Sequence, residues 1–440
     1  MPEAFGLIGM VAVFINVSKT LANGGFSASL IRVKDISPLD YSTVFTLNIL
    51  FAIVLYGVLF FTAPTIANFY NETILSKLIR IMGLILLLNP FSMIPSTMLN
   101  RKLKFKEQFY VQFPSMVISS ILALFLAYNG YGIWSLVWKE LTFSVMSILL
   151  LFYFVRWKPL FGLDKAKLRF HFGFGSKLMI TSLLQGVANN VQNIVIGKVF
   201  SVTDLGFYSR AKSMESLPTQ FVFNGLNRVA YPLISASRNN QAVVQVHSNI
   251  LQMVFYVLLP IQVISFVIGE PLFIWLLTEK WSASVPYFQL LLIASIFFPL
   301  IRFNQNLFML LGKGKLLLTI SVLQNILLLA LILSVMHLGI TQIIYCLIGV
   351  NVVSALVSSW YVSKYFSYGI KRLVNDTYSI FILNLILGIV FYILQSRFFD
   401  RFSIGIDILL VAGCFLAIYF LISFLLKFEV IGILRKNWNI

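Results

Sequence analysis

The sequence predicts an all-α integral membrane protein with two pseudo-symmetric six-helix lobes followed by two further helices. Three observations predict this class: 59% of the 440 residues are hydrophobic and only 11% charged, apolar runs follow one another along the chain, and landmarks recur about 200 residues apart. Soluble domains carry roughly 25% charged residues. In hydrocarbon, a helix satisfies its own backbone hydrogen bonds, so apolar runs of this kind are expected to cross a bilayer as helices.

The apolar runs predict about thirteen membrane spans. The hydrocarbon core of a bilayer is about 30 Å thick, so a helix needs about 20 apolar residues to cross it. Runs of this length are expected to span at residues 4–31, 41–61, 77–99, 109–127, 131–155, 175–200, 205–227, 247–268, 285–311, 316–336, 340–363, 374–395 and 404–426.

The basic residues predict the sidedness of these spans. Of the 33 Lys and Arg residues, 22 lie in odd-numbered connections or the C-terminal tail, eight lie in even-numbered connections, and three lie within spans. Short loops rich in Lys and Arg face the cytoplasm. We therefore expect a multi-pass protein of the cell (inner) membrane with its C-terminus in the cytoplasm and its N-terminus outside.

Motifs that carry chemistry are not found in the sequence, which has no GxGxxG, Walker, HExxH or GxSxG pattern. Cys346 and Cys414 lie in apolar runs, and His171, His247 and His337 stand alone at the edges of loops, without the spacing of metal ligands. The net charge of +18 is spread over short loops, which indicates topology and not nucleic-acid binding. We expect no catalytic residue, metal or cofactor, and no nucleic-acid partner.

An internal repeat relates the two halves of the chain. Gly6 in "AFGLI" matches Gly206 in "DLGFY", and Gly25 in "NGGFS" matches Gly225 in "FNGLN". Six spans separate equivalent points, so both halves run in the same direction and are related by an axis along the membrane normal. The second copy has the span 175–200 before its landmark loop, whereas the first copy begins at that loop. We expect that the first transmembrane helix is missing from this sequence; a protein of thirteen spans is the alternative.

The repeat also predicts the domain organisation. Residues 1–155 are expected to form an incomplete N-terminal lobe, 156–176 a cytoplasmic interlobe linker, 177–366 the C-terminal lobe, and 367–440 two extra helices with a cytoplasmic tail. Asp164 in the linker is expected to cap a helix. The basic and apolar residues that follow it fit either a segment lying on the anionic leaflet or an ordinary basic linker.

Polar residues inside the spans are the candidate substrate-binding residues. They lie on helix faces that carry further polar side chains, or several turns below a loop. The candidates are Lys19, Lys139, Arg210, Lys212, Arg302, Asn189 and Gln192. Because intramembrane charges face cavities or partners, they predict a hydrated cavity between the lobes. Its surplus of cations suits phosphate oxygens, and its amides suit sugar hydroxyls.

A structural interpretation stays open for part of this set. The amides of Gln185, Asn189 and Gln192 could hold packed helices together. Lys212 and Glu215, three residues apart on one helix, could form a self-contained pair. Both interpretations place the same polar residues inside the membrane but assign them no ligand.

Acids near the remaining cations are few. Glu140 could neutralise Lys139 or Lys19, although adjacent residues on a helix do not face each other. Lys19 and Arg302 have no acid three or four residues away. A charge buried without partner or water is very costly, which favours a water-filled cavity for both.

Five stretches carry a resemblance to a known family: "PEAFGLIGMVAVF" (2–14), "GGFSASLIR" (24–32), "YGIWSLV" (131–137), "NNVQNIVIGKVFSVTDLGFYSRAKSMESLP" (189–218) and "NRVAYPLIS" (227–235). Through them the whole chain resembles the multidrug/oligosaccharidyl-lipid/polysaccharide exporter superfamily, in its polysaccharide-transporter branch of Wzx-type flippases. The resemblance is most specific between 189 and 235, and it implies a carrier of fourteen helices with both termini in the cytoplasm. The chain departs from the family in lacking the first helix and in placing Gln192 where relatives often carry Asp, which puts an ion-coupling role there in doubt.

The resemblance implies a function as well as a fold. It implies a flippase that carries polyprenyl-diphosphate-linked oligosaccharide repeat units from the cytoplasmic to the outer leaflet by alternating access, for the synthesis of lipopolysaccharide O-antigen, capsule or exopolysaccharide. The implied partners are this lipid-linked oligosaccharide, the lipid bilayer, and a polysaccharide polymerase with its glycosyltransferases. The diphosphate would be held by the five candidate cations.

Two other functions fit parts of the sequence. A cation-coupled drug exporter of the same superfamily would need membrane-embedded acids, of which this chain has few. A membrane-integral glycan polymerase would need catalytic acids or a sizeable loop on the outside, whereas the longest even-numbered connection has about twenty residues. We therefore expect a transporter and not an enzyme.

Overall fold

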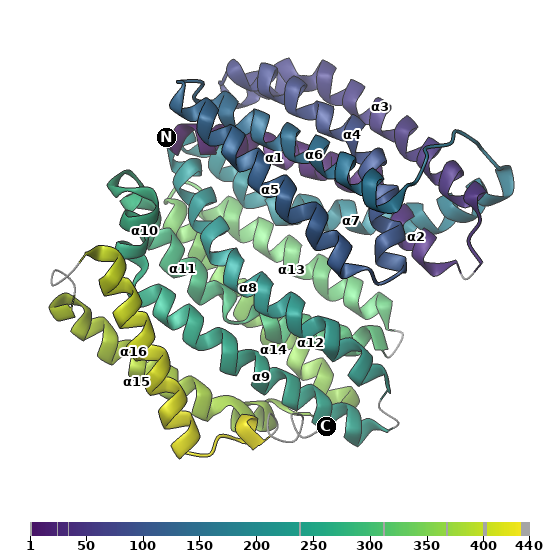
Figure 1. Ribbon diagram of the computed structural model, residues 1–440. Coiled ribbons are helices and arrows are strands. Elements are labelled where there is room, and N and C mark those ends of the chain that lie inside the picture. The colour runs from purple at the N-terminus through teal and green to yellow at the C-terminus, as the bar shows by residue number, and fades with distance from the viewer. Residues whose placement is uncertain are drawn as a thin grey trace. The chain divides into compact units, whose positions relative to one another are not determined.

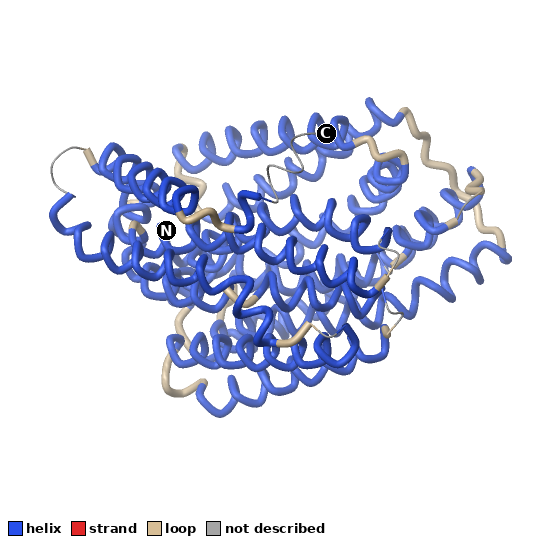
Figure 2. The backbone as a smooth tube through the Cα atoms, turned by 90° about the horizontal axis from the view of Figure 1, so that it is seen from below, coloured by secondary structure: helices blue, strands red, loops and turns tan. Residues whose placement is uncertain are grey.

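The computed structural model describes residues 2–23, 25–33, 35–236, 239–310, 313–366, 368–398 and 403–432, with the backbone alone for part of the two longest helices and a few helix ends. All regular structure in these residues is helical (Figure 2), which confirms the predicted all-α class. The helices group into two compact units, Met1–Gly206 and Phe207–Ile440 (Figure 1).

The first unit is built from six long helices and one short one. They are α1 (Pro2–Asn23), α2 (Phe26–Arg32), α3 (Pro38–Tyr70), α4 (Ile74–Arg101), α5 (Phe105–Tyr128), α6 (Ile133–Val155) and α7 (Lys165–Val199). Helix α1 packs against α3, α4, α6 and α7, and α3 runs beside α4 (Figure 1). The centre of the unit is therefore the helix that carries Lys19.

Local sequence explains where several of these helices begin and end. The expected span 4–31 is divided into α1 and α2 because Gly25 has a left-handed backbone (φ 68°), which a right-handed helix cannot continue through. Ser37 and Asp40 form a capping box at the start of α3. Asp164 accepts a hydrogen bond from the backbone N–H of Lys167, so its predicted role as a helix cap is confirmed.

The connection between α6 and α7 is docked on the start of α3. The rings of Trp157 and Phe161 lie 5.1 and 5.5 Å from the ring of Phe45, centroid to centroid. The backbone N–H of Gly162 donates to Oγ1 of Thr46 at 3.2 Å. The expected linker 156–176 is thus a short docked loop followed by the first turns of α7.

Helix α7 belongs to the first compact unit, since it packs on α1, α2 and α3. The boundary between the compact units lies at Gly206, within α8 (Val202–Ala236). The repeat predicts that the second lobe begins at residue 177, and this lobe boundary stays a prediction. The compact units divide the chain further toward the C-terminus because α7 packs on α1, α2 and α3.

The second unit contains the rest of α8 and nine further helical segments. They are α9 (Asn240–Val267), α10 (Gly269–Leu277), the 3-10 helix η1 (Glu279–Ser284), α11 (Val285–Ser295), α12 (Phe298–Leu310), α13 (Gly314–Val335), α14 (Ile340–Phe366), α15 (Ile370–Phe398) and α16 (Ile404–Leu425). Helix α9 packs against α15, and α15 and α16 run side by side (Figure 1). A continuous apolar core joins α9, α12, α14, α15 and α16.

The expected span 285–311 is broken into α11 and α12 at Ile296 and Phe297. Pro299 has no backbone N–H to donate to the carbonyl of Ser295, and its ring would clash with that carbonyl in a continuous helix. The break therefore has a local cause, Pro299, which can be identified in the sequence.

Eleven helices in the described residues are long and apolar enough to cross a membrane. They correspond to the predicted runs, except that the predicted spans 175–200 and 205–227 lie in α7 and α8, which are 35 residues long but are not among the eleven. The multi-pass membrane architecture is confirmed, whereas the count of thirteen spans stays a prediction.

Candidate functional site

The cations predicted in the first half cluster around the central helix α1. Lys19 is half-buried on α1, and Glu140 of α6 lies near enough to attract its ammonium group. Lys139 is half-buried next to Glu140. The structure therefore brings Lys19 of α1 near Glu140 of α6, and Lys139 adds a second cation to the same turn of α6. The acid near Lys19 comes from another helix, and it is one that the sequence named as a possible partner of either Lys19 or Lys139.

Of the other polar residues of α1, Asn23 has a partner on another helix, whereas Thr20 bonds within α1 and lies beside α7. Nδ2 of Asn89 in α4 donates to Oδ1 of Asn23 at 2.7 Å. Oγ1 of Thr20 donates to the carbonyl of Asn16 at 2.8 Å and lies next to Gly186 of α7, where a Cβ would meet it at 3.9 Å. The polar face predicted from the spacing in the first span is thus shared among α1, α4 and α7.

The amide stripe of α7 is described in part. Gln192 is buried, with 5% of its surface exposed. Asn190 donates from Nδ2 to the carbonyl of Gly186 within its own helix, at 2.8 Å. The side chains of Asn189 and Gln185 lie outside the described residues. Gln192 is therefore the member of the predicted stripe that the structure places inside the first unit.

The predicted residues of the second unit lie on α8 and α12. Lys212 is half-buried, with Nζ 5.7 Å from the ring centre of Tyr208, and Glu215 lies near enough to attract it. Oγ1 of Thr219 donates to Oε1 of Glu215 at 3.1 Å. Arg210 precedes this group by less than a turn. These contacts place a cation and an acid near each other on α8, which fits the interpretation that the two residues form a pair and leaves a role in substrate binding a prediction.

Arg302 on α12 has a more exposed side chain than the other four predicted cations. Its guanidinium lies 5.1 Å from the ring centre of Phe298, and Nη1 donates to Oε1 of Gln305 at 3.3 Å. The side chain is exposed in the structure. A guanidinium has five N–H donors, and within the described part of the chain only this one hydrogen bond engages them. Arg302 is thus a cation with donors to spare.

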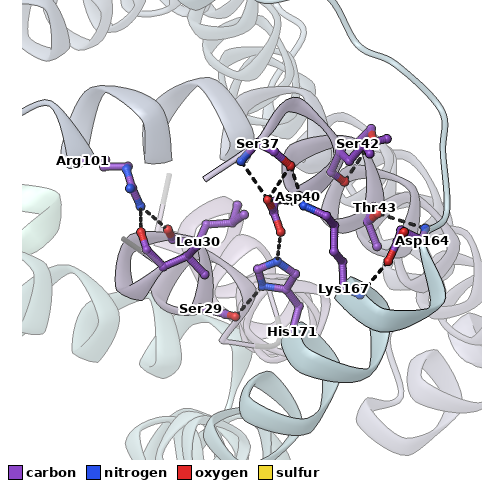
Figure 3. Close-up of polar contacts among 12 residues, drawn as sticks. Ser29, Leu30, Ser37, Asp40, Ser42, Thr43, Arg101, Asp164, Lys167 and His171 are labelled. Carbon is purple, nitrogen blue, oxygen red and sulfur yellow. Dashed lines mark hydrogen bonds and ion pairs between the residues drawn. The ribbon is translucent and has the colours of Figure 1, made fainter. Parts of the chain in front are cut away.

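A buried charge network that sequence reasoning missed ties α2, α3 and α7 together (Figure 3). Oδ2 of Asp40 accepts from the backbone N–H and the hydroxyl of Ser37, at 2.8 and 2.7 Å, and from Nζ of Lys167 at 2.6 Å. Oδ1 of Asp40 lies 3.1 Å from Nε2 of His171, whose Nδ1 lies 2.6 Å from the hydroxyl of Ser29. A buried carboxylate is thus matched by one lysine and one histidine.

The sequence carried a partial signal for this network. The run "SPLD" (37–40) has the spacing of a capping box, and Lys167 and His171 are four residues apart on one helix face. Arg101 strengthens the same region, because its Nη1 donates to the carbonyl of Leu30 at 2.8 Å and also to the carbonyl of Val33. These contacts fix the end of the first unit that the charge bias assigns to the cytoplasm.

The expectation that the histidines stand alone at loop edges is wrong for two of them. His171 in α7 and His247 in α9 are fully buried. Nε2 of His247 lies 3.2 Å from Oδ1 of Asn304, whose Nδ2 donates to the hydroxyl of Ser358 at 3.0 Å. Their partners come from distant parts of the chain, 142 residues away for His171 and 57 for His247, so no local motif reveals them. Among the described residues, no group of three or more His, Cys, Asp or Glu could hold a metal ion.

Comparison with known sequences identifies relatives of this chain. The family model described as "Polysaccharide biosynthesis protein" matches residues 1–286. The teichuronic acid biosynthesis protein TuaB of Bacillus subtilis (strain 168) is 26% identical over 294 residues, which are 66% of this chain and 60% of TuaB. The lipopolysaccharide biosynthesis protein WzxC of Escherichia coli (strain K12) is 22% identical over 295 residues, again 66% of this chain and 60% of the relative. The matches thus span about 60% of the length of these relatives.

Comparison with solved structures identifies the fold. The structure is similar to the lipid II flippase MurJ in an inward closed conformation, with a TM-score of 0.73 at 18% identity over 95% of this chain and 97% of that one. It is also similar to an inward-facing multidrug resistance transporter of the MATE family, with a TM-score of 0.66 at 14% identity over 83% of this chain and 91% of that one. The predicted fold class, an all-α integral membrane protein, is confirmed by this similarity.

Proposed function

Because this chain belongs to the polysaccharide biosynthesis protein family, we propose that it is a flippase for lipid-linked oligosaccharides. Its substrate class is a polyprenyl-diphosphate-linked glycan repeat unit, moved from the cytoplasmic to the outer leaflet for the synthesis of a surface polysaccharide. The observation that carries the proposal is the fold, which over 95% of the chain is similar to a lipid II flippase. TuaB and WzxC, which are named as proteins of teichuronic acid and lipopolysaccharide biosynthesis, support the same substrate class.

The charges of the first unit support an anionic substrate. Lys19 and Lys139 lie beside a single acid, Glu140, so the group keeps one net positive charge. Ammonium groups bind phosphate as point charges. The buried amide of Gln192, together with Asn189, would supply donors and acceptors to sugar hydroxyls.

The charges of the second unit have the same sign. The cations are Arg210 and Lys212 on α8 and Arg302 on α12, and the acids that we place at comparable depth in this unit are Glu215 on α8 and Asp407 in the first turn of α16. Arg302 retains most of its guanidinium donors, and a guanidinium fork matches the geometry of phosphate oxygens. We assign these three cations to the diphosphate as well.

Alternating access is the mechanism that we propose for transport. Transporters with this fold have been solved in both inward-facing and outward-facing conformations, with TM-scores of 0.66 and 0.51 to this structure. We propose that the moving lobes follow the internal repeat, residues 1–155 and 177–366, with 367–440 as an appended pair of helices. The chain itself then performs no chemistry on the glycan, and a polymerase and glycosyltransferases act before and after it.

The location that we propose is the cell (inner) membrane, with the C-terminus in the cytoplasm. Support comes from the excess of Lys and Arg in odd-numbered connections. The substrate would then be loaded on the side of the Asp40 network, where the lipid-linked glycan is assembled.

Reconstitution of the purified chain in liposomes tests the proposal. The liposomes contain a short-chain polyprenyl-diphosphate saccharide with a fluorescent sugar, and a membrane-impermeant reductant quenches the label on the outer leaflet. Without transport, about half of the fluorescence is protected because half of the lipid faces inward. We expect the chain to abolish this protection, and to leave it unchanged for the polyprenyl-monophosphate analogue.

Two controls make this experiment decisive. Protein-free liposomes measure spontaneous flipping, and a Lys77→Gln variant removes an exposed cation outside the predicted site. Protection that persists with the wild-type chain, or that is lost equally for diphosphate and monophosphate lipids, would contradict a diphosphate-selective flippase.

A further inference from the structure

A cavity of about 520 Å³ opens in the second unit between α9, α15 and the end of α16. Both signs of charge line it, together with apolar side chains: Asp376, Glu429, Lys427, Gln252, Ile382 and Ile386. The candidate substrate-binding residues do not line this cavity, so its chemistry is separate from the proposed function.

Asp376 is one of its two acids and is held firmly in place. Its Oδ2 accepts from the hydroxyl of Ser248 at 2.5 Å and from the hydroxyl of Tyr368 at 2.9 Å. Oδ1 has no hydrogen bond within the described part of the chain. Oδ1 is therefore available to accept a hydrogen bond from a ligand. The orientation of the side chain is already fixed by Ser248 of α9 and by Tyr368 in the connection before α15.

Glu429 is the second acid, and Lys427 is the cation beside it in sequence. Oε2 of Glu429 accepts from Nε2 of Gln252 at 3.2 Å, which leaves Oε1 without a hydrogen bond among the described residues. Lys427 follows the end of α16 with a left-handed backbone (φ 51°) and is exposed. In the part of the chain that the structure describes, Lys427 forms no ion pair. The cavity thus presents two anchored carboxylates and one cation that none of the described residues neutralises.

The apolar part of the lining continues onto the lipid-facing surface of α15 and α16. Tyr378, Ile382 and Ile386 recur at helical spacing on α15 and are exposed, as is Leu426 after the end of α16. Asp376 lies in the second turn of α15 and Lys427 just beyond the last turn of α16. The charged part of the cavity therefore lies at the helix ends, at the depth of lipid headgroups, and the apolar part extends toward the acyl chains.

We propose that this cavity binds a phospholipid whose headgroup carries both a primary ammonium group and a phosphate, as phosphatidylethanolamine does. The ammonium group donates to Oδ1 of Asp376 and to Glu429, and the phosphate pairs with Lys427. The acyl chains lie along Ile382 and Ile386. One lipid then bridges α9, α15 and α16.

Charge complementarity selects this headgroup over the alternatives. A purely anionic headgroup such as phosphatidylglycerol can pair with Lys427 but leaves two carboxylates facing an anion. A choline headgroup carries the same charges as ethanolamine, yet its quaternary ammonium has no N–H to donate to a carboxylate. A hydrogen bond between charged groups contributes about 1.5–3 kcal/mol, which corresponds to a tenfold or greater preference.

Native mass spectrometry of the purified full chain tests the proposal. The protein is delipidated in detergent and titrated with phosphatidylethanolamine, phosphatidylcholine or phosphatidylglycerol of identical acyl chains. We expect the ethanolamine lipid to form a one-to-one complex with about tenfold higher affinity than either of the others. Equal binding of the three lipids would show non-selective annular contact and would overturn the proposal.

Variants locate the binding site. Glu429→Gln keeps an acceptor for Gln252, and Lys427→Asn removes the charge with a residue that tolerates the left-handed backbone. Each is expected to lower the affinity for the ethanolamine lipid about tenfold, with Glu429→Gln lowering the preference over the choline lipid as well. Asp376→Asn should do the same, but it also weakens the contacts to Ser248 and Tyr368.

A matched control removes an acid elsewhere in the same unit. Glu270→Gln changes an exposed carboxylate in the first turn of α10, outside the cavity. It should leave the preference for the ethanolamine lipid unchanged. Wild-type affinity in both Glu429→Gln and Lys427→Asn, in protein that elutes as a single species, would place the lipid elsewhere and overturn the proposal.

Discussion

Gly6 and Gly206, the two glycines matched by the internal repeat, lie against each other where α1 meets the first turn of α8. A Cβ on Gly206 would fall 2.1 Å from the carbonyl oxygen of Pro2 and 3.2 Å from the backbone nitrogen of Gly6, and a Cβ on Gly6 would fall 1.9 Å from the carbonyl oxygen of Val202. Both glycines therefore stand where the backbones of α1 and α8 come too close for a side chain.

Alanine at either glycine should destabilise the protein strongly. The atoms that a new Cβ would meet are backbone carbonyls, which cannot rotate away, so α1 and α8 would have to separate. Overpacking of this kind costs about 1–3 kcal/mol and sometimes more. We expect Gly6→Ala and Gly206→Ala each to lower the thermal midpoint of the purified protein by several degrees, measured by differential scanning fluorimetry in detergent.

Gly57→Ala is the matched control, since no atom lies within 4 Å of its Cβ position. This substitution in α3 should leave the midpoint unchanged or raise it slightly, because alanine favours helix more than glycine does. A Gly6→Ala variant as stable as Gly57→Ala would show that the close approach of the two helices does not exist.

Lys167→Met should weaken the first unit, because it leaves the carboxylate of Asp40 buried without its lysine. Removing one partner of a buried pair costs about 3–5 kcal/mol. The capping contacts from Ser37 and the contact to His171 remain, so we expect a loss toward the lower end of this range. The urea-dependent unfolding of the purified chain, followed by tryptophan fluorescence, measures it.

An exposed ion pair supplies the comparison for the buried one. Nζ of Lys104 lies 2.9 Å from Oε1 of Glu107 at the start of α5, on the surface. Glu107→Gln should have no measurable effect on unfolding, because exposed pairs contribute little. Equal effects of Lys167→Met and Glu107→Gln would contradict the burial of the Asp40 network.

Arg302→Gln should impair transport of the diphosphate-linked glycan while the protein still folds. Loss of charge-assisted hydrogen bonds to phosphate is expected to weaken apparent substrate affinity by about tenfold or more. Arg302→Lys should be intermediate, because an ammonium group retains the charge but not the bidentate fork. Transport rates in liposomes at several substrate concentrations measure both variants.

The control for Arg302 is Lys280→Gln, which removes an exposed cation of the same unit from the 3-10 helix η1. It should transport at the wild-type rate. If Arg302→Gln also transports at that rate and affinity, Arg302 takes no part in diphosphate recognition.

Asn89→Leu should loosen the packing of α4 on α1. The substitution removes the donor to Asn23 and leaves that amide oxygen without its partner inside the membrane. Hydrogen bonds between membrane helices contribute about 0.6–2 kcal/mol. We expect a loss of about 1 kcal/mol in the free energy of unfolding. The control is Asn129→Ala, which should change this free energy little, because the exposed amide of Asn129 donates to the carbonyl of Phe125 four residues earlier.

Most of the fold follows from the sequence, because bilayer thickness and helix geometry dictate the length and composition of each span. Two expected spans are broken, and each break has a local cause in the sequence: Gly25 between α1 and α2, and Pro299 between α11 and α12. The assignment of α7 to the first compact unit could not be predicted, since it depends on packing against α1 to α3 and not on any property of α7 alone.

The site was less predictable than the fold. Spacing within one helix selected Lys19, Lys212 and Arg302 as candidates, and it placed Lys212 near Glu215. The sequence named Glu140 as a possible partner but could not choose between Lys19 and Lys139, and it missed Asp40 and His171, because those partners meet across helices that are far apart in sequence. Helical periodicity predicts which residues share a face of a helix, whereas tertiary packing determines which faces contact each other.

The docking of Trp157 and Phe161 on Phe45 has a consequence for protease sensitivity. Arg156 is exposed and basic and is followed by Trp157, so by composition the connection between α6 and α7 contains a trypsin site. A protease must draw a stretch of chain into its cleft in extended form, which here requires two aromatic rings to leave their packing and the backbone to release Thr43 and Thr46. The connection between these helices is therefore expected to outlast digestion that cleaves less anchored basic loops.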